Sequence, residues 1–143
     1  MPDMTWQDVV QRLQLEQHPE GGFYRETFRD VASGTDGRSC STAIYFLLPE
    51  GVVSRWHRVD AAEAWHFYAG APLQLIEAAG PNRPDLATAR HITLGNDLAA
   101  GHVPQHVIPA GVWQQARSLG RWTLVGCTVA PAFEFSGFEI APA

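Results

Sequence analysis

The sequence contains no lysine, and this absence limits the partners that the protein can have. All ten of its Lys and Arg positions are arginines, which stand singly along the chain, and fifteen Asp and Glu give a formal net charge of −5. Nucleic-acid binding needs a concentrated basic face, which this pattern does not supply. An anionic membrane surface repels an acidic protein. We therefore expect neither nucleic acid nor membrane among its partners.

Cysteine and long hydrophobic runs are also scarce. Cys40 and Cys127 lie far apart in apolar contexts, and two cysteines do not make a disulfide framework, so we expect two reduced, buried thiols. The N-terminal segment MPDMTWQDVVQRL has no apolar stretch of signal-peptide length. No later segment approaches the roughly 20 apolar residues of a membrane span. The expected location is the cytoplasm.

What is present fits one globular domain. The chain has 143 residues, of which 45% are hydrophobic and 17% charged, which is enough for one real core and too little for two. We find no internal repeat, low-complexity tract or linker. The sequence therefore predicts a single domain over residues 1–143.

One helix is predicted over residues 5–15. Thr5 is an N-cap with Asp8 at the capping-box spacing, and the step into Pro19 bounds the helical region. One apolar stripe runs along this segment at the spacing of a helix face: Trp6, Val9, Val10 and Leu13.

Short segments rich in aromatic and branched residues follow, each closed by Gly, Pro, Asn or Asp. They cover residues 23–28, 42–48, 64–69, 73–78, 89–94, 105–108, 113–117 and 122–129. Many short strands at regular spacing are typical of an antiparallel sandwich or barrel. The predicted fold class is therefore all-β.

Residues 51–70, GVVSRWHRVDAAEAWHFYAG, carry the most informative pattern. His57 stands six residues after Gly51, Glu63 six residues after His57, and Gly70 seven residues after Glu63. This spacing resembles the first motif of the cupin superfamily, G-x5-H-x-H-x3-E-x6-G. Val59 stands where the motif has its second histidine.

The second cupin motif, G-x5-P-x-G-x2-H-x3-N, is recognisable in its centre, where residues 109–111 supply the P-x-G turn. Val103 occupies the position of the leading glycine, Gln114 that of the histidine and Ser118 that of the asparagine. The motifs therefore support a cupin barrel more firmly than a cupin metal site.

A narrower resemblance rests on the run HPEGGFYRE at residues 18–26. It extends to STAIYFLL at 41–48, WHRV at 56–59, EAWHF at 63–67 and VIPAGVW at 107–113. These segments resemble a family of small stand-alone cupins of unknown function. The resemblance implies a single-domain jelly-roll barrel (double-stranded β-helix) with one short N-terminal helix, usually paired into homodimers, and it implies no settled reaction.

A cupin metal site uses three imidazoles and a carboxylate, which suit Fe, Mn, Ni or Zn. The matching positions here are His57, Val59, Glu63 and Gln114. Valine cannot ligate and a neutral amide is a weak ligand, so no cofactor is expected, and a divalent metal on His57, Glu63 and Gln114 would be weakly held or adventitious. His66 is no substitute, because strand alternation points it away from Glu63.

His57 and Glu63 can move protons without a metal, since histidine titrates near neutral pH and a carboxylate can orient it. This pair resembles the arrangement in cupins that epimerise nucleotide-linked keto sugars, which also use a tyrosine donor. Tyr24 and Tyr45 are the candidates for that donor. The alternative is that His57 only hydrogen-bonds a ligand.

Four further residues are candidate ligand-binding groups. Gln114 would orient a substrate, Trp65 would form a stacking wall, Tyr45 would bind the ligand through its hydroxyl, and Arg25 would meet an anionic group. Core packing of the aromatic residues and solvation of Arg25 are the alternatives.

These observations favour a small-molecule-binding cupin. The first hypothesis is a metal-independent isomerase or epimerase acting on a carbohydrate-like or keto metabolite, with His57 as base and Glu63 as its partner. The second is a non-catalytic binder that uses the same pocket, and the third, least favoured, is a metal-dependent cupin enzyme such as a dioxygenase. The sequence does not decide between an enzyme and a binding protein.

Overall fold

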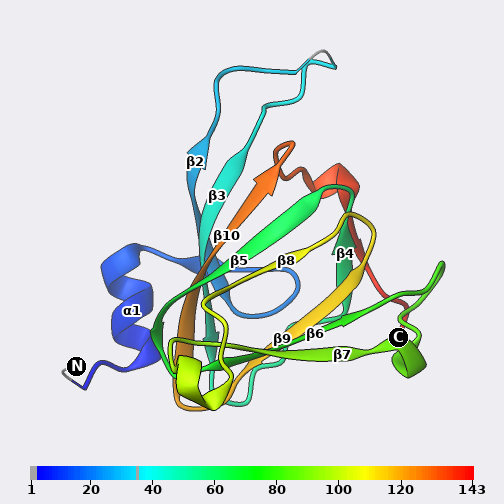
Figure 1. The fold of residues 1–143 in the computed structure, drawn as a ribbon. Helices are drawn as coiled ribbons and strands as arrows, with labels where there is room; N and C mark the ends of the chain where they lie inside the picture. Colours follow the sequence, from blue (N-terminus) through cyan, green and yellow to red (C-terminus); the bar gives the residue numbers. More distant parts are fainter. Residues whose placement is uncertain (1–2, 35) are drawn as a thin grey trace.

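The structure is a computed structural model that describes residues 3–34 and 36–143. It contains one α-helix, α1 (Trp6–Leu13), which lies on the outside of the β-structure (Figure 1). The predicted capping box is confirmed, because Thr5 Oγ1 accepts from the Asp8 N–H at 3.1 Å and the Asp8 carboxylate accepts from the Thr5 N–H at 3.0 Å. The helix ends at Leu13, two residues before the predicted boundary, and its C-cap Gln14 has a φ of +56°.

Strands of the described residues form two antiparallel sheets, which confirms the predicted jelly-roll barrel (Figure 1). The six-stranded sheet has the order β1 (Glu16–Gln17), β2 (Phe23–Arg29), β3 (Thr42–Pro49), β10 (Trp122–Ala130), β5 (Ala62–Gly70), β8 (Gln105–Ile108). The five-stranded sheet has the order β11 (Phe138–Ile140), β4 (His57–Val59), β9 (Trp113–Ser118), β6 (Leu73–Ala78), β7 (Arg90–Leu94). Three short 3₁₀ turns interrupt the loops: η1 (Leu86–Thr88), η2 (Leu98–Ala100) and η3 (Phe135–Gly137).

The main core fills one end of the barrel between the sheets. Its buried members are Phe46, Leu48, Trp65, Leu73, Leu75, Leu94, Ile108, Ala116, Val125 and Cys127. A second cluster lies on the outer face of the large sheet, where Val9 of α1 and Leu15 pack against Leu47 and Trp122. The strand β3 is therefore apolar on both faces, since each face is covered.

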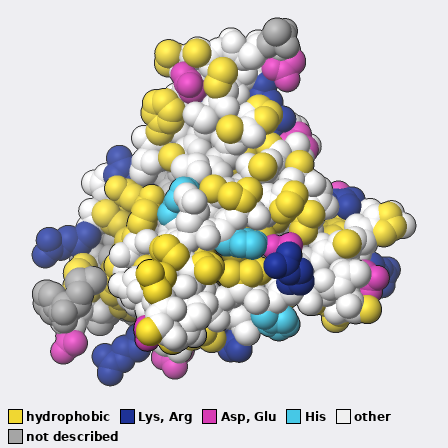
Figure 2. Space-filling model, in the orientation of Figure 1, with side chains coloured by type: hydrophobic (Ala, Val, Ile, Leu, Met, Phe, Trp, Pro, Cys, Tyr) yellow, Lys and Arg dark blue, Asp and Glu magenta, His cyan; other side chains and the backbone are white. Residues whose placement is uncertain are grey.

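The arginine side chains do not gather into one basic patch on the face drawn in Figure 2. In the part of the chain that the structure describes, no helix has the length and apolar character needed to cross a bilayer. Cys127 is buried as predicted, but the prediction is wrong for Cys40, which is exposed in the β2–β3 connection.

Candidate functional site

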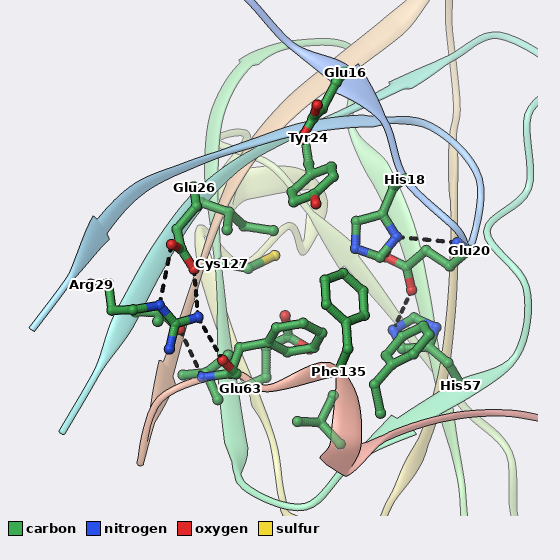
Figure 3. Close-up of a pocket in the computed structure, with 16 residues that line it drawn as sticks. Glu16, His18, Glu20, Tyr24, Glu26, Arg29, His57, Glu63, Cys127 and Phe135 are labelled. Carbon is green, nitrogen blue, oxygen red and sulfur yellow. Dashed lines mark hydrogen bonds and ion pairs between the residues drawn. The ribbon is translucent and has the colours of Figure 1, made fainter. Parts of the chain in front are cut away.

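A cavity of about 330 Å³ opens at the end of the barrel where β3 and β5 begin and β10 ends (Figure 3). The residues that line it come from both sheets, from the turn before β2 and from the segment before β11. They are Glu16, His18, Glu20, Tyr24, Glu26, Arg29, Thr42, Ile44, His57, Val59, Glu63, Cys127, Val129, Phe133, Phe135 and Phe138. The cavity thus combines acidic, imidazole and aromatic side chains.

A buried ion pair lies on one wall of this cavity. His57 Nε2 is 2.6 Å from Glu20 Oε2, and their side chains are 2% and 6% exposed. His57 Nδ1 lies 2.8 Å from the carbonyl oxygen of Arg55. A carbonyl oxygen only accepts, so Nδ1 carries a proton. Both ring nitrogens of His57 are therefore engaged with the protein.

The pKa of His57 results from opposing effects. Burial lowers it, but the negative charge of Glu20 and the hydrogen bond to Glu20 raise it, with smaller contributions in the same direction from Glu63 and the Arg55 carbonyl. The sum of these effects is a raised pKa. The environment therefore favours the imidazolium form of His57 opposite a carboxylate.

His18 lies beside this pair, and its pKa is shifted in the opposite direction to that of His57. The Glu20 N–H donates to His18 Nδ1 at 3.1 Å, and Figure 3 shows the other ring nitrogen facing the cavity. Burial lowers the pKa of His18 and outweighs the charge of Glu20, while His57 lowers it further. Because Nδ1 accepts, the neutral ring carries its proton on Nε2. His18 therefore presents an N–H donor to the cavity.

A chain of hydrogen bonds supports Glu63 from below. Gln114 Nε2 donates to Glu63 Oε1 at 2.8 Å, and Gln114 Oε1 accepts from Trp65 Nε1 at 2.7 Å. Gln114 and Trp65 are each 1% exposed, so both lie under the cavity and not on its lining. Because both groups of its amide are satisfied within the protein, Gln114 orients the Glu63 carboxyl.

Burial raises the pKa of Glu63 to about 7. The charge of His57 and hydrogen bonds from Gln114 and Cys127 lower it, and the charge of Glu20 raises it. Burial also raises the pKa of the Cys127 thiol, which stays protonated. Glu63 is therefore a carboxyl group that exchanges its proton near neutral pH, a property that acid–base catalysis requires.

Tyr24 stands at the cavity with its hydroxyl protonated. Burial raises its pKa, and the charges of Glu16 and Glu26 raise it further. Its ring meets the edge of His18 at a centroid distance of 4.5 Å. Tyr24 is thus a second neutral donor, on the same side as His18.

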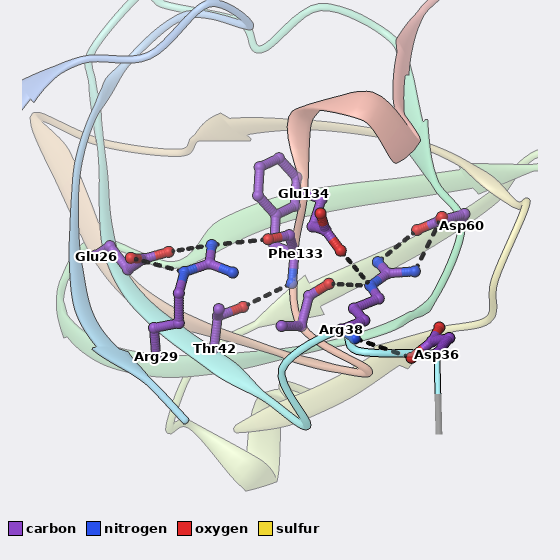
Figure 4. Close-up of polar contacts among 9 residues, drawn as sticks. Glu26, Arg29, Asp36, Arg38, Thr42, Asp60, Phe133 and Glu134 are labelled. Atoms are coloured by element: carbon purple, nitrogen blue, oxygen red, sulfur yellow. Dashed lines mark hydrogen bonds and ion pairs between the residues drawn. The ribbon is translucent and has the colours of Figure 1, made fainter. Parts of the chain in front are cut away.

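A segment that we call the strap (residues 131–137, between β10 and β11) closes the cavity with Phe133 and Phe135. Figure 4 shows the contacts that hold it. Arg29 Nη2 donates to the Phe133 carbonyl at 2.8 Å, and Thr42 Oγ1 accepts from the Phe133 N–H at 2.9 Å. Arg38 then ties the strap to the body of the barrel, since it contacts Asp60 at 2.8 Å, Glu134 at 3.1 Å and the Ala132 carbonyl at 2.8 Å.

The structure brings some of the predicted site residues together and separates others. His57 and Glu63 both line the cavity, but they come from different sheets, and the partner within contact of His57 is Glu20 instead of Glu63. Gln114 and Trp65 lie beneath Glu63, so neither is placed to contact a ligand as predicted.

Arg25 and Tyr45 require a correction, because neither lines the cavity. Side chains alternate along β3, so Tyr45 lies opposite Ile44, on the outer face, against Tyr68 at a centroid distance of 6.3 Å. Arg25 is exposed, and its guanidinium donates to the Leu13 carbonyl at 3.3 Å.

His66 is placed as strand alternation predicts. It lies on the outer face of β5, where its Nε2 is 2.9 Å from Thr128 Oγ1.

Sequence reasoning missed Glu20 and His18, which lie inside the run HPEGGFYRE. The signal was present in the density of titratable residues directly before a strand. These residues form a turn in which the His18 N–H donates to the Gly22 carbonyl at 2.9 Å and the Arg55 N–H donates to the Glu20 carbonyl at 2.7 Å. Side chains in a turn do not alternate between two faces as they do in a strand. The direction in which Glu20 and His18 point is therefore known only from the folded structure.

The four positions that match the cupin ligand set do not fit a metal centre. His57 Nε2 faces Glu20, Val59 has no donor, and the amide of Gln114 is used on both sides. Within residues 3–34 and 36–143, no group of three His, Cys, Asp or Glu side chains is arranged to hold a metal ion. Among the described residues, these four positions therefore lack the donor set of a cupin metal centre.

Comparison with known proteins places this geometry in a family. Two solved structures share the fold and most of the chain: protein SO0799 from Shewanella oneidensis (37% identity, TM-score 0.87, 96% of this chain and 85% of that one) and a hypothetical protein from Leishmania major (31% identity, TM-score 0.84, 96% and 87%). The uncharacterized protein YML079W of Saccharomyces cerevisiae is 26% identical over 154 residues, which cover 94% of this chain and 74% of that protein.

A more distant likeness shows the fold alone. Oxalate decarboxylase from Bacillus subtilis is 13% identical with a TM-score of 0.63, and the match covers 87% of this chain and 29% of that enzyme. The model of the family described as "Cupin superfamily (DUF985)" matches residues 7–141. The predicted family is thereby confirmed, and the chain belongs to the DUF985 family of the cupin superfamily.

Proposed function

We propose that this protein is a metal-independent isomerase or epimerase that transfers a proton on a small carbonyl compound. The observation that carries the proposal is the 2.6 Å pair of His57 and Glu20 in the cavity where the pKa of Glu63 is about 7. Proton-transfer catalysis needs titratable groups whose environments drive their pKa values apart. One protonated imidazole, one neutral imidazole and one carboxyl that titrates near pH 7 meet this need.

We assign the role of base to Glu63. The hypothesis based on sequence gave this role to His57, but both of its ring nitrogens are paired, with Glu20 and with the Arg55 carbonyl. A base works best when its pKa lies near the working pH, and Glu63 has that property together with a fixed orientation. The His57–Glu20 pair then supplies a constant electrostatic background for Glu63.

The proposed reaction needs no oxidant and no cofactor. The Glu63 carboxylate takes a proton from the carbon beside the substrate carbonyl, and the electron pair of the broken C–H bond forms the double bond of an enolate. We assign the stabilisation of its oxygen to the N–H of His18 and the role of second proton donor to the hydroxyl of Tyr24, since both side chains line the cavity. Return of this proton from Glu63 to the former carbonyl carbon, with transfer of the neighbouring hydroxyl proton to the enolate oxygen, gives the isomer. The epimer forms when the Tyr24 hydroxyl protonates the opposite face of the carbon while Glu63 keeps the first proton, after which Tyr24 regains a proton from water and Glu63 releases its own.

Proton abstraction can be tested before the product is known. Untagged protein treated with EDTA is incubated in D₂O with a panel of ketoses, aldoses and keto acids, and proton NMR follows the loss of the signal beside the carbonyl. We expect exchange above the buffer rate for at least one compound. Glu63→Gln should slow it by about 10²- to 10⁴-fold, since that is the usual effect of removing a general base.

Glu50→Gln is the matched control, because Glu50 is an exposed carboxylate outside the cavity. It should exchange at the wild-type rate. A compound that stabilises the protein against heat but never exchanges would support the non-catalytic binder instead. Exchange that disappears with EDTA and returns with one divalent metal would support the metal-dependent alternative.

A further inference from the structure

The charges of the cavity restrict what it can bind. Four glutamates line it (Glu16, Glu20, Glu26 and Glu63), and Arg29 is the single Lys or Arg among the described lining residues. Binding sites for phosphate or carboxylate groups are built from arginine, lysine or free backbone N–H groups directed at the anion. The charged side chains that line this cavity are instead mainly acidic.

The positive charges that are present already have partners. Arg29 pairs with Glu26 at 2.7 Å and donates to the Phe133 carbonyl at 2.8 Å. His57 pairs with Glu20 at 2.6 Å, and burial favours the neutral form of His18. The cavity lining that the structure describes therefore holds excess negative charge and offers no unpaired cation to an anionic ligand.

The size and walls of the cavity restrict the ligand further. A volume of about 330 Å³ is at the lower end of the range for small-molecule sites, which suits one ring and not a nucleotide-linked sugar. Tyr24, Phe135 and Phe138 supply aromatic faces that can pack on the C–H face of a ring, while His18 and Glu63 supply a donor and an acceptor for hydroxyl groups.

We propose that the cavity selects an uncharged, hydroxylated compound of monosaccharide size and rejects its phosphorylated and carboxylated counterparts. This inference rests on the proposed function, since it names the substrate class of the same site. It narrows the sequence-based expectation of a carbohydrate-like or keto metabolite to the uncharged members of that group.

The sign of the electrostatic potential in the cavity can be measured without a substrate. Phe135 lines the cavity and is 51% exposed, so Phe135→Cys in a Cys40→Ser background places a reactive thiol at the opening. Methanethiosulfonate reagents with neutral, anionic and cationic ends are compared by their rates, each divided by its rate with free cysteine. We expect the anionic reagent to react about fivefold or more slowly than the cationic one at low salt, as the Coulomb energy of one or two nearby charges implies.

Adding Glu16→Gln to this background should reduce the ratio of the cationic to the anionic reagent rate. Adding Glu50→Gln should leave this ratio unchanged. Phe133→Cys reports from a second position on the strap in case Phe135→Cys folds poorly. Equal normalised rates for the three reagents, or a faster anionic reagent, would overturn the proposal.

Matched ligands test the same inference directly. Thermal shifts are measured with D-fructose and D-fructose 6-phosphate, and with D-glucose and D-glucuronate, at equal concentration and ionic strength. We expect the uncharged member of a pair to give the larger stabilisation, and a larger shift with either charged member would overturn the proposal. A failure of deuterium exchange would contradict the proposed reaction but leave the reagent ratio, and therefore the charge selectivity, unaffected.

Discussion

At the scale of single residues, Glu63 links the site to the stability of the protein. Burial of its carboxyl group disfavours the ionised form and raises the pKa. The hydrogen bond from Gln114 stabilises the carboxylate and offsets only part of this rise. The unfolded chain exposes the same carboxyl to water with a pKa near its ordinary value of 4.5. Folding is therefore coupled to protonation of Glu63.

The sign of this coupling gives a prediction. A pKa raised in the folded state gives stability that is complete below pH 4.5 and lost as the pH rises through about 7. Glu63→Gln lacks this titration. Between these two pH values, the free energy of unfolding of the wild type should fall relative to the variant by on the order of 3 kcal/mol, measured by urea denaturation. Glu50→Gln should follow the wild type, and parallel curves for Glu63→Gln and the wild type would contradict the raised pKa.

At the scale of elements, the turn at residues 18–22 positions Glu20 against His57. The turn depends on Gly22, whose φ is +78° and where a Cβ would lie 2.7 Å from the Leu47 carbonyl oxygen. Gly37 has nearly the same backbone conformation, with φ of +81°, but nothing lies within 4 Å of its Cβ position. Alanine substitutions at the two glycines therefore separate the cost of the left-handed backbone conformation from the cost of a steric clash.

Gly37→Ala should cost about 1–2 kcal/mol of stability, which is the usual cost of the left-handed conformation for a residue with a Cβ. Gly22→Ala should cost clearly more, because β3 cannot move away without losing its pairing with β2. Denaturant titration measures both. Equal losses would show that the turn adjusts without disturbing β3.

At the scale of the whole molecule, the outer face of the large sheet indicates self-association. Tyr68 and Val107 are 52% and 49% exposed on this face, and Tyr68 lies across Gly126, where a Cβ would clash with its ring. Exposed apolar side chains on a sheet are commonly covered by a second copy across a two-fold axis. We expect a homodimer, as the family resemblance implies.

Light scattering at micromolar concentration should therefore give about twice the monomer mass of 15.7 kDa. Tyr68→Glu should shift the protein toward the monomer, because it places charge in the apolar interface. Phe28→Glu is the control, since Phe28 is 52% exposed on β2, away from β5 and β8 in the order of the sheet. A monomeric wild type, or a dimer unaffected by Tyr68→Glu, would contradict this surface.

The sequence by itself determined the features that depend on neighbouring residues. The capping box needs Thr5 and Asp8 three positions apart, and the two-residue period places Glu63 and His66 on opposite faces of β5. The spacing from Gly51 to Gly70 resembles the first cupin motif, and that resemblance implied the cupin barrel.

Tertiary structure decided which face of a strand is inside. Phe46 and Leu47 are both buried, because α1 covers the outer face of β3, so apolar pattern alone does not tell Tyr24 from Tyr45. The pairing of Glu20 with His57 joins a turn to a strand of the other sheet. Such a contact depends on how the turn packs against the barrel, and no local period encodes it.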